Sequence, residues 1–181
     1  MFFVHSQDKD LADFIVMLIT LTGFMGSGKT TVGRILADAL GCPFLDLDEM
    51  IVKKAGKSIP DIFAQDGEPA FRQLEARLLR QTVEKYGEST AVLSLGGGAV
   101  TEAASATLLH EKTVCIYLRA TLDTLMDRLA GETAGRPLAD ASLAERLAAR
   151  EPLYEKTAHV TLDTDGLSPD EVVDEIIITS L

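Results

Sequence analysis

Residues 23–30 read Gly23-Phe24-Met25-Gly26-Ser27-Gly28-Lys29-Thr30, and this stretch decides the fold. Its pattern is G-x-x-x-x-G-K-[ST]. An apolar run rich in β-branched residues precedes it at 15–21, and apolar residues at helical spacing follow it at 31–40. A strand, a glycine loop and a helix in this order are the context in which the pattern binds phosphate. We therefore predict a phosphate-binding loop between a buried strand and a helix.

Each fixed position of this phosphate loop (residues 23–30) has a physical role. The glycines tolerate positive φ and carry no side chain, so backbone N–H groups can turn toward phosphate oxygens. The following helix adds its unpaired N–H groups and the positive end of its dipole. Lys29 would reach the β- and γ-phosphates, and the Thr30 hydroxyl would ligate Mg²⁺. The alternative, a glycine-rich turn with a surface lysine, is disfavoured because both flanks match, so the sequence predicts binding of a nucleoside triphosphate.

The composition is typical of one globular domain. The chain has 181 residues, 46% of them hydrophobic and 25% charged. Its net charge of −11 argues against nucleic acid or an anionic membrane as a partner. Cys42 and Cys115 fit no metal-ligand spacing, so we expect small buried thiols in a reducing compartment. The apolar run at 15–21 is too short to span a bilayer and ends in the phosphate loop, so we expect a cytoplasmic protein.

Strand and helix patterns alternate along the rest of the chain. Further strands are predicted at 43–46, 90–95, 113–118 and 160–162. Helices are predicted at 49–54, 68–86, 101–110, 121–130 and 142–154, with a short one capped by Ser58 and a terminal one begun by Ser168 and Pro169. Five strands alternating with helices imply an α/β fold, in which a parallel sheet is covered on both faces and binds ligands at the carboxyl ends of its strands.

We expect residues 1–181 to form a single domain. Residues 1–13 precede the first strand pattern and are predicted to be a flexible extension. Arg136 and Pro137 stand in a polar, glycine-flanked stretch at about 129–140. This stretch is predicted to be a mobile lid that closes on the phosphates.

Two carboxylates and three glycines follow predicted strands. Asp46 and Asp48 end the second strand, where period-two alternation would place both carboxylates on one side. Two carboxylates beside a phosphate loop are suited to binding metal-coordinated water and to orienting a hydroxyl nucleophile. Gly96-Gly97-Gly98, here called the triple glycine, marks a place where the backbone approaches something closely. Taken alone, the carboxylates are also typical of a solvated loop edge, and the glycines of a tight turn.

Three arginines complete the candidate set, namely Arg72, Arg136 and Arg150. The planar guanidinium pairs well with a carboxylate or a phosphate. Each arginine taken singly is also typical of a surface charge.

This combination resembles the shikimate kinases, which phosphorylate the 3-hydroxyl of shikimate with ATP. The matching pieces run in order along nearly the whole chain from about residue 15: Gly23 to Thr30, Phe44 to Asp48, Ile62-Phe63, Gly67-Glu68, Phe71 to Glu75, Gly96 to Gly98, Arg136-Pro137-Leu138 and Arg150 to Tyr154. The resemblance implies a P-loop kinase fold like that of the nucleoside monophosphate kinases. It also implies ATP and Mg²⁺ as cofactors and shikimate as the small-molecule partner.

The resemblance implies a role for each matching residue. Nucleotide contacts would come from Gly26, Ser27, Gly28, Lys29, Thr30, Thr31, Arg128 and Arg136. In the family, an arginine that stacks on adenine stands seven positions before the lid arginine. Seven positions before Arg136 this chain has Leu129, and the arginine stands one position earlier, at Arg128. The resemblance therefore implies that Arg128 takes this role and that the lid is one residue longer. Metal contacts would come from Thr30 and, through water, Asp46.

The acceptor would be held by a second set: Asp48, Phe63, Phe71, Arg72, Gly96, Gly97, Gly98 and Arg150. In this reading Asp48 orients the 3-hydroxyl or takes its proton, and Arg72 and Arg150 hold the carboxylate. The catalytic residues would be Lys29, Asp48 and Arg136.

Two other functions compete with this interpretation. Another small-molecule kinase of the same fold, such as a gluconate kinase, would lack two arginines combined with Asp48 and the triple glycine. A non-catalytic nucleotide-binding module would need the phosphate loop alone. We expect a monomer, because no sequence feature demands an interface.

Overall fold

A computed structural model of the chain describes residues 17–132 and 141–180. Its centre is a five-stranded sheet in the order β2-β3-β1-β4-β5. The strands are β1 (Leu18–Thr22), β2 (Phe44–Asp46), β3 (Ala91–Ser94), β4 (Val114–Arg119) and β5 (Val160–Asp163). Every neighbouring pair is parallel. The predicted α/β class and parallel sheet are therefore confirmed.

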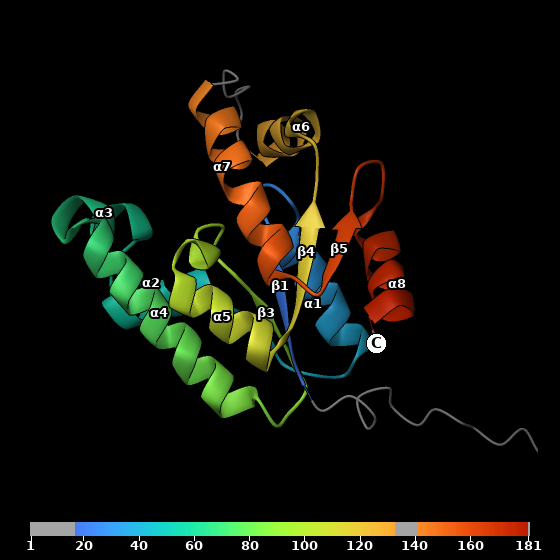
Figure 1. Cartoon of the computed structure of the whole chain (residues 1–181), viewed down its shortest axis with the longest axis horizontal. Coiled ribbons are helices and arrows are strands. Elements are labelled where there is room, and N and C mark those ends of the chain that lie inside the picture. Colours follow the sequence, from blue (N-terminus) through green and yellow to red (C-terminus); the bar gives the residue numbers. More distant parts are fainter. Residues whose placement is uncertain (1–16, 133–140, 181) are drawn as a thin grey trace, which may run out of the picture.

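Helices cover both faces of the sheet (Figure 1). They are α1 (Lys29–Ala39), α2 (Leu47–Ala55), α3 (Ile59–Gln65), α4 (Gly67–Tyr86), α5 (Ala103–Lys112), α6 (Leu122–Glu132), α7 (Ala141–Thr157) and α8 (Pro169–Ser180), with a 3₁₀ turn, η2, at Ala99–Thr101. The connections between neighbouring parallel strands run through these helices, as parallel pairing requires.

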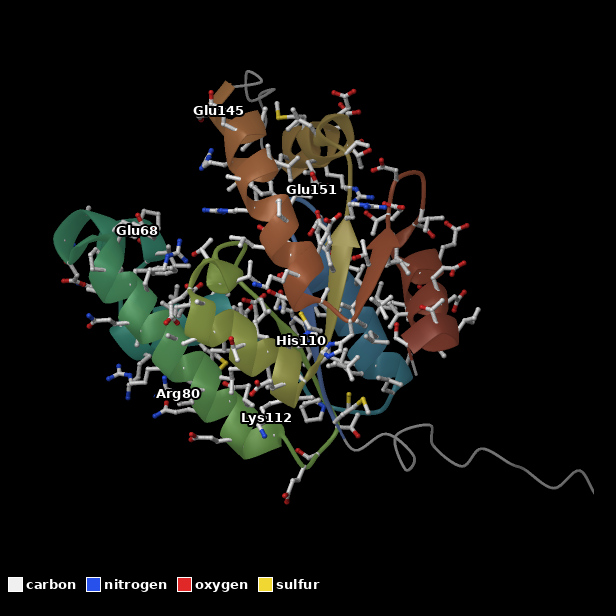
Figure 2. All side chains as sticks on the ribbon, in the orientation of Figure 1. Glu68, Arg80, His110, Lys112, Glu145 and Glu151 are labelled. Atoms are coloured by element: carbon white, nitrogen blue, oxygen red, sulfur yellow. The ribbon has the colours of Figure 1, made fainter. Side chains whose placement is uncertain are left out.

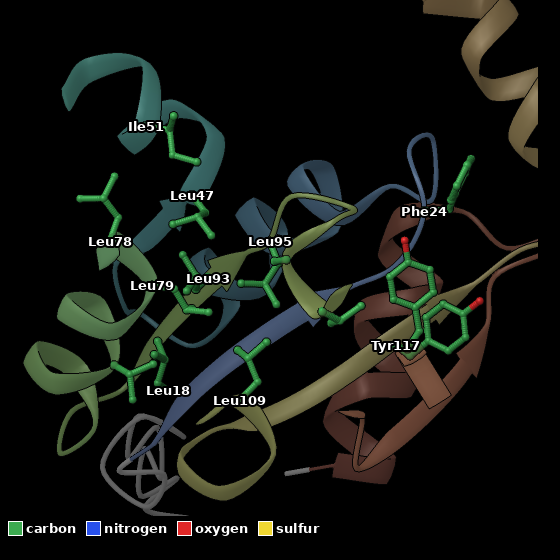
Figure 3. Packing of buried hydrophobic residues seen from close by; sticks show 14 of the residues in the cluster. Leu18, Phe24, Leu47, Ile51, Leu78, Leu79, Leu93, Leu95, Leu109 and Tyr117 are labelled. Carbon is green, nitrogen blue, oxygen red and sulfur yellow. The ribbon is translucent and has the colours of Figure 1, made fainter. Parts of the chain in front are cut away.

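The strands alternate between two apolar layers because successive side chains point to opposite faces. Ile19 and Leu21 of β1 pack with Val32 and Leu36 of α1 and with buried residues of α8. Leu18 of the same strand packs into the other layer, which joins α2, α4, α5 and α7 (Figure 3). Burial on two faces explains why the central strands are nearly continuous apolar runs.

The helix starts follow their sequence signals. The Ser58 hydroxyl accepts a hydrogen bond from the Asp61 N–H at 3.3 Å and caps α3. Ser168 and Glu171 bond each other's backbone N–H groups at 3.3 and 2.8 Å, which is a capping box at the start of α8. Both predicted caps are confirmed.

The structure corrects the conformation expected at Asp48. β2 ends at Asp46, and α2 begins at the next residue, so Asp48 lies in the first helical turn rather than on an extended strand. The cause is the Asp46 side chain, whose Oδ1 accepts hydrogen bonds from the N–H groups of Asp48 and Glu49 at 3.0 and 3.2 Å. Period-two alternation therefore does not relate the two carboxylates.

Other boundaries also differ from the predictions. The helix predicted at 101–110 is divided into η2 and α5, because the Thr101 hydroxyl bonds the Gly98 carbonyl at 2.7 Å and closes a separate turn. The predicted lid at 129–140 begins inside α6, which runs to Glu132. Residues 133–140, with Arg136, and the predicted extension at 1–13 lie outside the described residues. Both cysteines are free thiols, but Cys42 is only half-buried, whereas Cys115 is buried as predicted.

Candidate active site

The candidate site lies where β1, β2 and β3 end. These strands are neighbours in the sheet, and each continues into a predicted site segment at its carboxyl end. β1 leads into the phosphate loop, β2 into Asp46 and Asp48, and β3 into the triple glycine. Parallel strands thus bring together segments that are far apart in the sequence.

The phosphate loop has the backbone that its glycines predict. Gly23, Gly26 and Gly28 all have positive φ, and Gly28 is the N-cap of α1. Lys29 folds back over the loop, and its Nζ donates to the carbonyls of Gly23 and Phe24 at 2.9 and 2.8 Å. Burial lowers the pKa of Lys29 to about 8, although the nearby Asp48 and Asp46 carboxylates oppose this shift.

The Thr30 hydroxyl lies between a carboxylate oxygen and a second hydroxyl. It donates to Oδ2 of Asp46 at 2.9 Å and lies 3.4 Å from the hydroxyl of Ser94 at the end of β3. Hydroxyl and carboxylate oxygens are ligands that Mg²⁺ accepts, usually together with waters and substrate phosphates. Within residues 17–132 and 141–180, no group of three or more His, Cys, Asp or Glu side chains is gathered to hold a metal. The donor set fits a cation that arrives with a nucleotide and keeps several waters.

Asp48 and Glu75 both lie against Gly96. A Cβ atom at Gly96 would come within 2.8 Å of Oδ1 of Asp48 and 3.0 Å of Oε1 of Glu75. Burial, and then the Asp46 charge, raise the pKa of Asp48, while Lys29 and Arg72 oppose the rise. Glycine is needed here because any side chain would displace the carboxylates.

Arg72 is held by two carboxylates of its own helix. Its Nη1 donates to Oε2 of Glu75 at 2.7 Å, and its Nη2 donates to Oε1 of Glu68 at 3.2 Å. Figure 2 labels Glu68 on α4. Glu75 is only 4% exposed, its Oε1 has no hydrogen-bond partner among the described residues, and burial raises its pKa against the effect of Arg72. An unpaired buried carboxylate oxygen beside Asp48 is unusual, because buried polar atoms nearly always have a hydrogen-bond partner.

Aromatic rings stand beside the arginines. The ring centroids of Phe63 and Phe71 are 4.7 Å apart, and the Arg72 guanidinium lies 5.0 Å from the Phe71 ring centroid. Across the site, the Arg150 guanidinium lies 5.9 Å from the ring centroid of Phe24 in the phosphate loop. Nη1 of Arg150 also donates to the Gly97 carbonyl at 3.4 Å. Both arginines therefore contact the triple glycine, Arg72 at Gly98 and Arg150 at Gly97. Arg150 lies within α7, which continues for two more turns after it.

A cavity of about 340 Å³ opens on the other side of the phosphate loop. Its lining comprises Gly26, Ser27, Gly28, Thr31, Val32, Arg128, Thr164, Leu167, Pro169 and Val172. Arg128 is held there by Thr164, whose backbone carbonyl accepts from Nη2 at 2.7 Å. The cavity thus joins the predicted nucleotide residues Thr31 and Arg128 to the loop.

Sequence reasoning assigned no role to three residues of this region. Glu75 lies on the buried face of α4, and a charged residue at such a position was the available signal. Ser94 precedes the triple glycine by two positions and had no distinctive pattern. Tyr154 belongs to a quoted motif, but only the fold shows its hydroxyl bonding to the Gly97 carbonyl. Of the predicted site residues, Arg136 alone lies outside the described residues.

Comparison with known proteins decides the family. The family model of shikimate kinase matches residues 25–180. The chain belongs to the shikimate kinase family. It is 42% identical over 164 residues to the shikimate kinase of Enterococcus faecalis, covering 88% of this chain and 95% of that relative. Membership makes the chain a kinase and gives ATP as the phosphoryl donor.

Solved structures agree with this assignment. The shikimate kinase of Acinetobacter baumannii, solved in complex with shikimate, matches with a TM-score of 0.78 and 34% identity, covering 90% of this chain and 91% of that one. A gluconokinase from Sinorhizobium meliloti matches with a TM-score of 0.56 and 18% identity over 90% of each chain, which shows a shared fold alone. Among the described residues, no helix is long and apolar enough to cross a membrane.

Proposed function

We propose that the chain transfers the γ-phosphoryl group of ATP to the 3-hydroxyl of shikimate. The observation that carries this assignment is the contact of Asp48 and Arg72 with the triple glycine. Asp48 lies against Gly96, and Arg72 lies against Gly98, close to the phosphate loop. A carboxylate that can accept from a hydroxyl group and a guanidinium that can bind a carboxylate group thus lie on the same three-residue segment.

On the donor side, we infer that the loop amides and Lys29 bind the β- and γ-phosphates. Phosphoryl transfer depends mainly on positioning and on neutralising the charge of the γ-phosphoryl oxygens. Thr30, together with Asp46 through water, would hold Mg²⁺, which neutralises phosphate charge when bound. The hydrogen bond between Thr30 and Asp46 supports this pairing. Arg128 and Thr31 line the cavity that would hold the base.

On the acceptor side, Asp48 would orient the 3-hydroxyl and take up its proton. Its raised pKa brings this carboxyl closer to the range in which it can exchange a proton near neutral pH. Arg72 and Arg150 would bind the carboxylate, and Phe63 and Phe71 would form an apolar wall. We add Glu75 to this set, because its unpaired oxygen faces the same glycine as Asp48. Arg136 would neutralise charge on the transferred group, and this role remains a prediction.

A coupled assay of ADP release tests the assignment. The full chain is mixed with ATP, Mg²⁺ and, separately, shikimate, gluconate or no acceptor. We expect rapid turnover with shikimate and background rates in the other two reactions. Turnover with gluconate in place of shikimate would favour the sugar-acid kinase alternative. ATP binding without turnover on any acceptor would favour a nucleotide-binding module.

We further propose a single-domain, cytoplasmic monomer in which residues 1–13 are dispensable for catalysis. Light scattering at working concentrations tests the oligomeric state. A variant that begins at residue 14 should keep the kcat and both KM values of the full chain.

A further inference from the structure

Tyr154 stands one helical turn after Arg150 on α7, yet no step of phosphoryl transfer requires it. Its side chain is completely buried, and its ring packs against Tyr117 of β4 with the centroids 5.0 Å apart. Figure 3 labels Tyr117 at the same end of the apolar cluster as Phe24. The Tyr154 hydroxyl donates to the Gly97 carbonyl at 2.5 Å. A buried tyrosine hydroxyl normally finds such a partner, but this partner is the centre of the triple glycine.

Gly97 connects α7 with the phosphate loop. Its carbonyl receives the Tyr154 hydroxyl and, at 3.4 Å, Nη1 of Arg150. A Cβ atom at Gly97 would lie 3.4 Å from the Gly23 carbonyl oxygen, 3.6 Å from the Tyr154 hydroxyl and 3.7 Å from the Met25 nitrogen. The glycine therefore lies between α7 and the phosphate loop, and the tyrosine fixes it to α7.

The tyrosine hydroxyl also acts on Arg150 itself. Burial raises the pKa of Tyr154 to about 12, and Arg150 opposes the rise through its charge and a hydrogen bond to the tyrosine. The hydroxyl is consequently protonated at neutral pH and stands between a guanidinium donor and a carbonyl acceptor. Without the hydroxyl, nothing would keep the long 3.4 Å contact between Arg150 and the Gly97 carbonyl from shortening, and charged donors form the stronger bonds to carbonyls.

We propose that Tyr154 is a positioning residue for the acceptor: its hydroxyl forms the short bond to the Gly97 carbonyl and holds Arg150 at the longer 3.4 Å contact, so that the guanidinium can turn to the substrate carboxylate. The inference rests on the proposed function of Arg150. Tyr154 itself touches no reacting atom. Its effect should therefore appear in acceptor binding rather than in the chemical step.

The first test compares Tyr154→Phe with Tyr117→Phe in the full chain. Both changes remove one hydroxyl from adjacent rings, but the Tyr117 hydroxyl forms no hydrogen bond with the described residues. For Tyr154→Phe we expect the KM for shikimate to rise about tenfold, the scale of one lost hydrogen bond to a charged group. The kcat and the KM for ATP should change by less than about twofold. Tyr117→Phe should match the parent, and thermal denaturation should show both variants folded.

A double-mutant cycle with Arg150→Ala separates positioning from a general structural role. If Tyr154 acts through Arg150, Tyr154→Phe raises the KM for shikimate in the parent but not in the Arg150→Ala background. An equal rise in both backgrounds, no rise at all, or an equal rise with Tyr117→Phe would overturn the inference. If Arg150→Ala alone leaves the KM for shikimate unchanged, the proposed carboxylate clamp fails and the inference fails with it. If Arg150→Ala raises the KM for shikimate but Tyr154→Phe leaves it unchanged, the inference about Tyr154 is wrong and the proposed function is not affected.

Discussion

The Arg72 guanidinium lies directly against the backbone of Gly98. A Cβ atom at Gly98 would stand 2.5 Å from Nη1 and 2.6 Å from Nη2 of Arg72, which is closer than carbon and nitrogen can approach. The ion pair of Arg72 with the buried Glu75 limits how far the guanidinium can move away. The triple glycine therefore provides a backbone without side chains against which Asp48, Glu75 and Arg72 pack.

We expect Gly98→Ala to displace Arg72 and to lower kcat/KM for shikimate roughly 100-fold, as a shift of about 1 Å in an active site does. Gly97→Ala is the matched comparison, because its new methyl group would meet neighbours at 3.4 Å or more. Its loss should be clearly smaller. Steady-state kinetics with both variants check this order, and equal losses would show that Arg72 does not require the space above Gly98.

Asp48→Asn should lower kcat by roughly 10² to 10⁴-fold, the range for removal of a general base. The Kd for ATP should stay nearly unchanged, since the proposed phosphate contacts come from the phosphate loop. Glu49→Gln is the control: it lies in the same first turn of α2, but its carboxylate is exposed and pairs with Arg34 at 2.9 Å. Stopped-flow kinetics and calorimetry separate the two effects. Normal turnover by Asp48→Asn would remove this carboxylate from the mechanism.

Much of this site follows from local sequence, because its backbone segments are defined by short-range rules. The phosphate loop needs glycines at set positions, and the sheet follows from alternating apolar segments. The prediction that Asp48 lies on an extended strand was wrong because two local rules competed there. The capping hydrogen bonds of Asp46 outweighed strand alternation and started a helix. The roles of Glu75 and Tyr154 depend on partners far away in the chain, at Gly96 and Gly97. Such contacts appear only once the strands are ordered in the sheet.

Asp46 serves both local structure and the proposed metal site, so two substitutions should separate these roles. Asp46→Asn keeps a side-chain acceptor for the cap, whereas Asp46→Ala removes it and should lower the free energy of unfolding by about 1 kcal/mol. Both should raise the Mg²⁺ concentration for half-maximal activity, because both remove the carboxylate next to Thr30. Urea denaturation and Mg²⁺ titration measure the two effects. An unchanged Mg²⁺ requirement in Asp46→Asn would contradict metal ligation through Asp46.

The buried ammonium of Lys29 predicts that nucleotide binding takes up a proton. In the free protein the pKa of Lys29 is about 8, below its ordinary value of 10.5, so the amine loses its proton as the pH rises through 8. Bound phosphates favour the charged form and raise this pKa, so binding must restore the proton wherever the free protein lacks it. Uptake should grow from about a quarter of a proton at pH 7.5 to nearly one at pH 9.5, and affinity for ATP should fall over this range.

Calorimetry in buffers of different ionisation enthalpy measures this uptake directly. Lys29→Arg is the control, because a guanidinium keeps its charge throughout the range and should abolish the pH-dependent uptake. The expected contrast is thus a rising proton count in the parent and a flat one in the variant. A flat count in the parent would mean that Lys29 is already fully charged before the nucleotide binds. In that case the desolvation of its ammonium in the folded loop would be offset by the nearby Asp48 and Asp46 carboxylates.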